Sequence, residues 1–475
     1  MINHPLAYTR MLADDDIERI LSASFNVLSD TGLQVQSKEI FAVMKKAGAV
    51  VDDAANRIMF SKKMVEEHLK TVPSEWVLHA RNPQRNVAIG GKSMVTAPGY
   101  GSAFIADKDG KRRYAELKDF KKFAYLAYRS DEIDVTGGLL VEPNDVAPAL
   151  RAAEITAALI RNSDKPFMGS VAGREGAKDS LEIAKIVFGD IKSKPYILSL
   201  ININSPLHLD SRMADAMYEY AMQGQPILLT PGIMMGITAP VTIAGALVQA
   251  FAELLGCVTI SQVLRPGLPV IIGTGGFGSD LRNGGPGFGR PENALGTQLG
   301  AEIARKLKIP FRCSAAVTGA RKADCRSGYE KMMTAMTAVN SGAHFCLQAA
   351  GILDCINSMS YEQFIIDTEI WSYVKRFTKP VVINDDTIAQ EIIKNNTSGL
   401  LENEHTVKYM REELYCPALA KPDNYDQWLK NGNSDIILQA GEKAEEILKH
   451  FRPPVLDENI EREIKAYISR RKKSV

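Results

Sequence analysis

The stretch QPILLTPGIMMGITAPVTIAGALVQAFAELLG, residues 225–256, decides the expected fold because it contains one complete strand–loop–helix unit. It starts with the short apolar run PILLTPG at residue 226, where a proline at the first strand position is tolerated. A methionine-containing loop follows, and then the helical stretch APVTIAGALVQAFAELLG. Repetition of such a unit predicts parallel strands joined by helices.

The same unit recurs on both sides of residues 225–256. Further apolar runs, each followed by a turn cluster and a helix-length segment, are SMVTAP near 95, DVTGGLLV near 135, PFMGSV at 166, PYILSLI at 195, LPVIIGTGG at 269, PFRCSAAV at 310 and GAHFCLQAA at 342. Eight units predict an α/β fold of the (β/α)8 TIM-barrel type, although an open doubly wound sheet gives the same local pattern. We favour the barrel.

The two ends of the chain follow a different pattern. DDDIERILSASFNVLSDTG and SKEIFAVMKKAG near the start carry helix-spaced apolar positions with polar starts and glycine stops. We therefore expect an N-terminal, mainly helical cap over 1–92, a catalytic barrel over 93–362 and a C-terminal helical extension over 363–475. The basic end ISRRKKSV is expected to be solvated or to contact another subunit.

Composition excludes several classes of partner. The 475 residues include 57 Lys and Arg against 56 Asp and Glu, so no electrostatic argument favours nucleic acid or an anionic membrane surface. The N-terminus lacks the order of a secretory signal, and no uninterrupted apolar run reaches the roughly 20 residues that cross a bilayer. Six cysteines without a CxxC pair are expected to be reduced thiols. These observations predict a cytoplasmic enzyme with a small substrate.

The glycine-rich segment GTGGFGSDLRNGGPGFG, residues 273–289, invites a phosphate-binding interpretation. A dinucleotide fingerprint requires the helix to begin within the glycines, whereas here the next helix is expected near Pro291. We interpret the segment as a long flexible lid or entrance loop and as the candidate docking surface for a partner.

Loops after the predicted strands contain residues suited to a charged amine. Tyr100 and Phe277 lie in glycine-flanked loops, and aromatic faces attract methylated ammonium groups, although each ring is equally suited to packing. Arg321 and Lys322 follow the seventh strand, where a cation is suited to a substrate carboxylate or else simply solvated.

His344 and Cys346 form a His-x-Cys pair on the eighth predicted strand. With Cys355 or Cys416 as a third ligand, they would resemble a catalytic zinc site. Ordinary burial accounts for Cys346, since free cysteine is commonly a small core residue. We therefore predict no metal and expect His344 to be either a neutral polar group lining the pocket or a core histidine.

Several longer stretches carry a family resemblance. SPLHLDSRMADAMYEYAMQGQPILLTPGIMMGITAPVTIAGALVQAFAELL, RPGLPVIIGT, GPGFGRPENAL, SGYEKMMTAMTAVNSGAH, HTVKYMREELYCPAL and NYDQWLKNG resemble the trimethylamine methyltransferase family over most of the chain. The resemblance implies a (β/α)8 barrel that passes a methyl group from an amine to the cobalt of a corrinoid (cobalamin) carried by a separate protein.

The chain departs from that family at one point. Founding members carry pyrrolysine in the loop after the seventh strand, whereas VTGARKADCRSGYEK here contains only standard residues, and the special position falls near Arg321. Members without pyrrolysine are linked to betaine-type substrates, and a quaternary nitrogen can lose a methyl group without prior activation. The resemblance thus implies glycine betaine, or else proline betaine, carnitine or γ-butyrobetaine.

The resulting hypothesis places aromatic faces at Tyr100 and Phe277 around the methylammonium, and Arg321, His344 and Gln348 around a carboxylate. The partner is a cognate corrinoid protein, and we expect a homo-oligomer. Two alternatives stay open: a zinc-dependent methylcobamide:thiol methyltransferase, and a non-catalytic sensor of quaternary amines.

Overall fold

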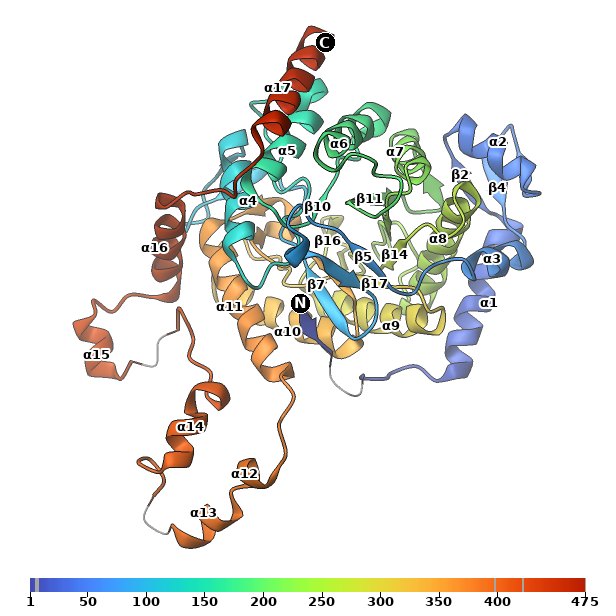
Figure 1. Cartoon of the computed structure of the whole chain (residues 1–475). Helices are drawn as coiled ribbons and strands as arrows, with labels where there is room; N and C mark the ends of the chain where they lie inside the picture. The colour runs from blue at the N-terminus through green and yellow to red at the C-terminus, as the bar shows by residue number, and fades with distance from the viewer. Residues whose placement is uncertain (5–7, 397–398, 421–422, 475) are drawn as a thin grey trace.

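The computed structural model describes residues 1–4, 8–396, 399–420 and 423–474. Its centre is a curled sheet surrounded by helices (Figure 1). In the described part of the chain the parallel strands follow the spatial order β7 (Ser93–Thr96), β18 (Phe345–Leu347), β17 (Phe311–Ser314), β14 (Val270–Gly273), β13 (Ile227–Pro231), β11 (Ile197–Ile203) and β10 (Phe167–Met168). β1 (Ile2–Asn3) adds to the edge of the sheet, antiparallel to β7. These seven parallel strands coincide with seven of the eight predicted from the sequence.

The eighth predicted strand, DVTGGLLV, is not a strand, which corrects the prediction. Its backbone nevertheless bonds to both edges of the curled sheet: the N–H of Val135 donates to Thr96 at 3.0 Å, and the N–H of Met168 donates to Gly137 at 2.8 Å. The ladder stops at Gly137, whose φ of 100° turns the chain out of the extended conformation.

A helix follows each of the seven parallel strands, an eighth helix follows the DVTGGLLV segment, and helices that are neighbours in sequence pack side by side around the sheet. They are α4 (Leu117–Arg129), α5 (Pro148–Asn162), α6 (Gly173–Phe188), α7 (Ser211–Met222), α8 (Ile243–Leu264), α9 (Pro291–Lys306), α10 (Cys325–Ser341) and α11 (Tyr361–Thr378). The start of α9 at Pro291 confirms the prediction. Among the described helices, α8 alone is long and apolar enough to cross a bilayer, but it is a core helix that packs on β13 and on α1 and α3 of the cap, with 72% of its most apolar stretch buried.

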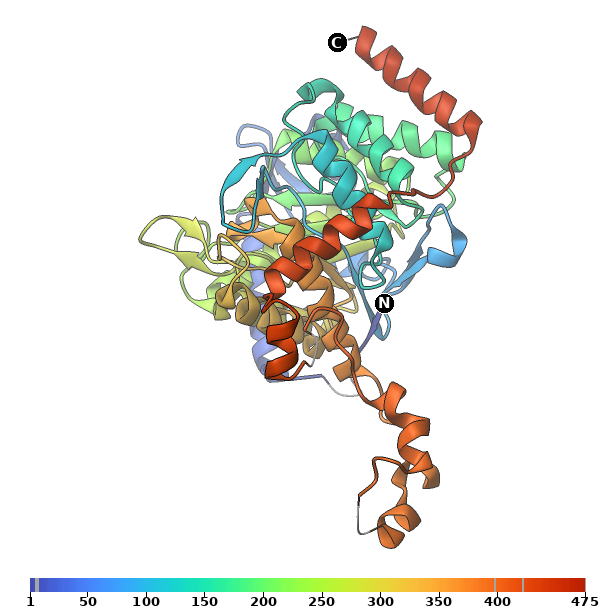
Figure 2. The same ribbon diagram turned by 90° about the vertical axis from the view of Figure 1, so that its left-hand side faces the viewer.

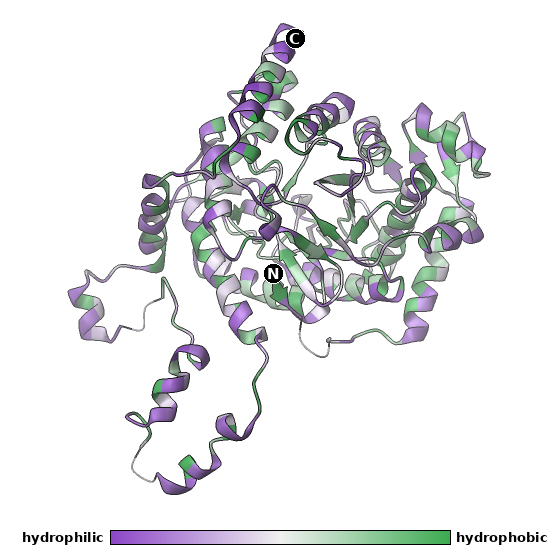
Figure 3. Ribbon diagram, in the orientation of Figure 1, coloured by the Kyte–Doolittle hydropathy of each residue, from purple (hydrophilic) through white to green (hydrophobic). Residues whose placement is uncertain are grey.

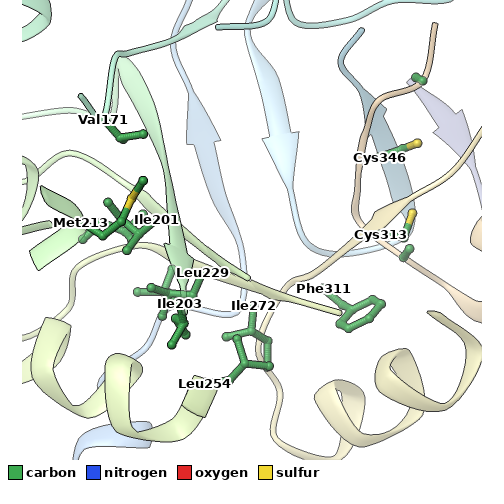
Figure 4. Close-up of a cluster of buried hydrophobic side chains, with 14 of the residues drawn as sticks. Val171, Ile201, Ile203, Met213, Leu229, Leu254, Ile272, Phe311, Cys313 and Cys346 are labelled. Carbon is green, nitrogen blue, oxygen red and sulfur yellow. The ribbon is translucent and has the colours of Figure 1, made fainter. Parts of the chain in front are cut away.

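Strand alternation divides the core into two layers. On β11, Ile201 and Ile203 point outward to the helices, where they meet Leu229, Leu254 and other apolar side chains (Figure 4). The alternating residues Leu198 and Leu200 point inward. We call the inward-facing set the inner cluster: Leu78, Val87, Ile89, Val95, Ala97, Val135, Met168, Leu198, Leu200, Leu228, Ile271, Phe345 and Leu347.

The N-terminal region is less helical than expected. α1 (Asp14–Asp30), α2 (Lys38–Lys46) and α3 (Lys62–Leu69) accompany a small sheet of β2 (Leu33–Val35), β3 (Val50–Asp52), β4 (Arg57–Met59) and β12 (His208–Leu209). A hairpin of β5 (Trp76–Leu78) and β6 (Val87–Ile89) supplies three residues to the inner cluster and covers the amino ends of the parallel strands. Strands of two or three residues show no detectable period, which explains why the sequence predicts only helices here.

The loops that follow the carboxyl ends of the parallel strands form what we call the carboxyl rim. They carry a second small sheet of β8 (Phe104–Ala106), β9 (Arg112–Tyr114), β19 (Ile352–Leu353) and β20 (Ser358–Met359). The glycine-rich segment forms a hairpin of β15 (Ser279–Asp280) and β16 (Gly285–Pro286). This hairpin projects from the body in Figure 2, as the predicted entrance loop would.

The C-terminal region contains two packed helices and one projecting segment. α16 (Ile436–Lys449) packs on α11 and α4, and α17 (Glu458–Lys473) packs on α5 and α6. We call the described residues of 379–434, between α11 and α16, the arm; its first part extends away from the body (Figure 1), and it returns at Tyr415 and Leu419, which bond to Ser372 and Glu369 of α11. It contains α12 (Asp385–Ile388), α13 (Gln390–Asn395), α14 (Glu404–Glu413) and α15 (Tyr425–Lys430).

Candidate active site

A buried arginine lies on the inward face of the sheet near the carboxyl rim. Gly273 is the register partner of Arg312, and strand alternation points both inward. A Cβ atom at Gly273 would lie 2.8 Å from Cδ of Arg312, so the missing side chain lets the guanidinium cross β14 and reach Thr230 on β13. The sequence of two neighbouring strands therefore places this charge inside the protein.

The guanidinium of Arg312 has only neutral protein partners among the described residues. Its Nη1 donates to Oγ1 of Thr230 at 3.3 Å, and its Nη2 donates to Oε1 of Gln348 at 2.9 Å. The buried Nε has no hydrogen-bond partner. Burial lowers the pKa of Arg312 to about 10, so the group stays charged at neutral pH. A buried cation held by neutral oxygens is suited to an anionic ligand.

Gly275 leaves room in front of this cation. A Cβ atom there would lie 2.9 Å from Nη1 of Arg312 and 3.5 Å from both Oγ of Ser314 and Oγ1 of Thr230. Guanidinium and hydroxyl donors therefore converge on the position that a side chain would fill. A carboxylate can accept hydrogen bonds from such a set.

Tyr100 supplies an aromatic ring at the same end of the sheet. It is partly buried and packs on the inner cluster beside Met168 and Gly138. Burial raises the pKa of its phenol, which therefore stays protonated and neutral. The loop holding Tyr100 lies next to the loop holding Gln348, because the N–H of Gln348 donates to the carbonyl of Pro98 at 3.2 Å.

A buried ion pair fixes the loops after β17 and β18. Nζ of Lys331 donates to Asp367 at 2.8 Å and to the carbonyl of Ala316 at 2.7 Å, and both side chains are fully buried. The same carboxylate accepts the N–H of Gly351 at 2.8 Å. Ala316 has a φ of +52°, a costly conformation for a residue other than glycine, and these bonds hold it.

The β15–β16 hairpin is held from two sides. Sγ of Cys355 donates to the carbonyl of Pro286 at 3.3 Å, and Oγ of Ser279 donates to the carbonyl of Met235. Its tip exposes Leu281, with 61% of the residue accessible, beside the loop that follows β13. The hairpin thus presents an apolar tip at the carboxyl rim.

The structure brings two of the five predicted site residues, Tyr100 and Gln348, to neighbouring positions and places the other three elsewhere. Phe277 is buried against Gly296 of α9. Arg321 lies on the surface with 80% of its side chain exposed, 3.8 Å from Asp354. His344 lies before β18, at the amino end of the sheet, where its Nδ1 accepts the N–H of Phe311 at 3.0 Å and burial lowers its pKa to about 4.

The cysteines of the suggested zinc site lie apart from the inward face. Cys346 belongs to the outward core layer beside Cys313, and burial raises the pKa of its thiol. Cys416 is exposed, on the arm. Across residues 1–4, 8–396, 399–420 and 423–474, no group of three or more His, Cys, Asp or Glu side chains is arranged to hold a metal ion.

Sequence reasoning missed Arg312, Thr230, Ser314 and Gly275. One indication was available, because PFRCSAAV places an arginine between two apolar residues of a predicted buried strand. Arginine is rarely buried without a partner, so that position deserved a functional interpretation.

Comparison with solved structures supports the fold. The chain is similar to the crystal structure of the Methanosarcina barkeri monomethylamine methyltransferase, with a TM-score of 0.51, 11% sequence identity, and coverage of 95% of this chain and 97% of that one. At this identity the similarity shows a shared fold alone.

Comparison with characterised sequences is more specific. The chain is 37% identical over 470 residues, 98% of both chains, to a glycine betaine methyltransferase of Desulfitobacterium hafniense strain Y51. It is 28% identical to a trimethylamine methyltransferase of Methanosarcina barkeri strain Fusaro, over 98% of this chain and 95% of the relative.

These relatives define the chain as a methyltransferase. The match to the trimethylamine methyltransferase family extends over residues 1–475, and the chain belongs to that family.

Proposed function

We propose that this enzyme transfers a methyl group from a carboxylated quaternary amine, glycine betaine first, to the Co(I) of a corrinoid carried by a separate protein. The observation that carries the proposal is Arg312, a buried cation with only neutral partners among the described residues. Membership of the family and the glycine betaine methyltransferase relative support the reaction.

In this proposal the carboxylate of the amine binds Arg312 in the space beside Gly275. Ser314 and Thr230 complete the binding set, and Gln348 orients the guanidinium. The methylammonium group then lies toward the ring of Tyr100, whose face attracts a cation. This arrangement assigns the carboxylate to Arg312 in place of Arg321, which is exposed.

The carboxyl rim fits the approach of a flat macrocycle. Gly101, Gly232 and Gly236 are exposed there, and a Cβ atom at Gly101 would meet nothing within 4 Å. The corrinoid of the partner supplies a nucleophile for the methyl carbon. A quaternary nitrogen departs as a neutral amine, so this chain needs no acid at that atom.

The remaining task of this chain is orientation. It binds the amine at two points, desolvates it, and aims one methyl group at the carboxyl rim. Holding reacting groups in line contributes roughly 7–11 kcal/mol toward lowering a barrier.

The β15–β16 hairpin is the proposed docking element for the corrinoid protein. Leu281 at its tip lies near Val241, and both are exposed, as is the neighbouring Ile237. Exposed apolar side chains beside a candidate site are typical of a protein contact. Shortening the hairpin should abolish methyl transfer and leave amine binding intact.

We propose that the curled sheet closes into a (β/α)8 barrel whose strands lie within residues 93–362 and whose last helix is α11, which ends at Thr378; the bonds of residues 134–137 to β7 and β10 support this closure. The cap over 1–92 then contributes the β5–β6 hairpin to that barrel. The enzyme would act in the cytoplasm, where its free cysteines stay reduced.

The test mixes the purified chain with a reduced corrinoid protein and, separately, glycine betaine, tetramethylammonium or trimethylamine. We expect glycine betaine to change the visible spectrum of the corrinoid and to yield N,N-dimethylglycine by NMR. Failure of every quaternary amine in the presence of a competent corrinoid partner would contradict the proposal. Faster turnover of trimethylamine than of glycine betaine would contradict the substrate assignment.

A further inference from the structure

Asn202 interrupts an apolar strand near its carboxyl end. Figure 3 shows that the strands of the curled sheet are largely hydrophobic, and β11 itself has the sequence ILSLINI. Asparagine is depleted in strands. The hydroxyl of Ser199 on the same strand donates to the carbonyl of Pro226 at 3.2 Å, whereas the side-chain amide of Asn202 is exposed and has no hydrogen-bond partner among the described residues. Folding alone therefore does not account for this residue.

The side chain of Asn202 faces the inside of the curled sheet. Its neighbours Ile201 and Ile203 point outward to the helices (Figure 4), and Leu200 belongs to the inner cluster. Strand alternation therefore turns Asn202 inward, two residues beyond Leu200 toward the carboxyl rim. An inward side chain that stays exposed lines open space, so Asn202 lies at the mouth of the sheet and not on its outer surface.

Asn202 lies next to the proposed carboxylate site. The register of the sheet pairs it with Thr230 of β13, and Oγ1 of Thr230 accepts Nη1 of Arg312 at 3.3 Å. Neighbouring strands lie about 4.8 Å apart, so the amide of Asn202 can reach a ligand that Thr230 and Arg312 hold. On its other side β11 pairs with β10, where Tyr100 packs beside Met168. Asn202 thus lies between the strand that carries the carboxylate anchor and the strand beside the aromatic ring.

We propose that Asn202 is a substrate-binding residue, whose Nδ2 donates a hydrogen bond to the carboxylate of the quaternary amine. The inference rests on the proposed function and adds a second, uncharged contact to the carboxylate beside Arg312. An amide supplies N–H donors without a charge. A lysine or arginine at this position would also bind the carboxylate, but it would repel the methylammonium group of the same small substrate. The amide therefore fixes the orientation of the amine between Arg312 and Tyr100 and leaves its cation undisturbed.

The test measures the Kd of glycine betaine and of tetramethylammonium by calorimetry, with the full-length chain and no corrinoid protein. Asn202→Ala should raise the Kd for glycine betaine about 10- to 150-fold, the range of a hydrogen bond to a charged group, and keep that for tetramethylammonium within about threefold. Asn202→Asp places a carboxylate beside that of the substrate. It should raise the Kd for glycine betaine at least as much and lower the Kd for tetramethylammonium, which carries only a positive charge. A general loss of structure cannot shift the two values in opposite directions.

The matched control is Asn26→Asp, which makes the same change of charge at an exposed asparagine of α1, a cap helix that packs on the outer side of α8. It should leave both Kd values unchanged. If the wild type binds glycine betaine, unchanged affinity in Asn202→Ala would overturn the inference, and so would a shift of both ligands in the same direction in Asn202→Asp. A wild type that binds no quaternary amine would instead overturn the proposed function, and this inference with it.

Discussion

Replacing Arg312 by Met separates carboxylate recognition from methyl transfer. Methionine keeps the length and apolar volume of the side chain and removes the charge. Truncating one partner of a buried charge pair costs about 2–5 kcal/mol of binding, which corresponds to a KM for glycine betaine about 30-fold to several thousand-fold higher. Tetramethylammonium lacks a carboxylate, so its KM should change less than about threefold if recognition is the only loss.

The free enzyme should not lose stability in this variant. Burial lowers the pKa of Arg312 to about 10, which means that the folded state disfavours its charge, by about 3 kcal/mol. Methionine removes that cost and also the hydrogen bonds to Thr230 and Gln348, worth about 1 kcal/mol each, so the free energy of unfolding should rise or stay level. Initial rates by corrinoid absorbance with both amines, together with urea unfolding, test the reasoning. An equal rise in KM for both amines, or a large fall in the free energy of unfolding, would refute the reasoning. Arg321→Ala is the control and should leave both KM values unchanged.

The remaining predictions concern the same end of the protein. Gly275→Val fills the space beside Arg312 and should abolish glycine betaine binding measured by calorimetry, while circular dichroism stays native; retained affinity would place the carboxylate elsewhere. Tyr100→Phe should keep KM within about threefold, and Tyr100→Leu should raise it for every quaternary amine by roughly 2- to 30-fold, the range of a cation–π contact; equal effects of the two variants would argue against a role for the ring. Because Arg312 loses its proton as pH rises through about 10, the Kd for glycine betaine should rise between about pH 9 and 11 while that for tetramethylammonium stays flat; parallel curves would exclude Arg312 as the titrating anchor. Lys331→Met leaves the Asp367 carboxylate buried without its partner and should lower the free energy of unfolding by about 3–5 kcal/mol. The double variant Lys331→Met with Asp367→Leu should lose less. An unchanged free energy of unfolding in the single variant would show that the pair does not hold the loops.

Periodicity was sufficient to predict the strand–helix units. Runs such as PILLTPG and PYILSLI are long and apolar because their strands are covered on both faces, and Pro291 begins a helix where proline is favoured. The segment at 134–141 failed the prediction because its two adjacent glycines end the ladder after a few bonds. The short strands of the cap depend on partners distant in sequence, such as His208 and Leu209 beside β2.

The candidate site was less accessible to sequence reasoning. Loop position suggested Tyr100, and Gln348 was expected near a substrate carboxylate at the end of the eighth predicted strand; both lie at the carboxyl rim. Arg312 lies within a strand. Its place in the site depends on its own side chain pointing inward and on the absence of a side chain at Gly273. Arg321 and His344 have suitable chemistry, but the first points to solvent and the second lies at the amino end. The direction in which a side chain points and the depth at which it lies are set by the register of its strand. The type of residue alone does not reveal that register.

The β5–β6 hairpin has a kinetic consequence. Leu78, Val87 and Ile89 fill the amino end of the inner cluster, so in the proposed mechanism the amine, its demethylated product and the corrinoid protein all use the carboxyl rim. Shared access imposes a compulsory order of binding. The amine binds before the corrinoid protein docks, and the demethylated product leaves after the corrinoid protein has left. Double-reciprocal plots of rate against amine concentration, at several concentrations of corrinoid protein, should therefore intersect. Excess corrinoid protein should slow turnover, because it traps dimethylglycine in the site.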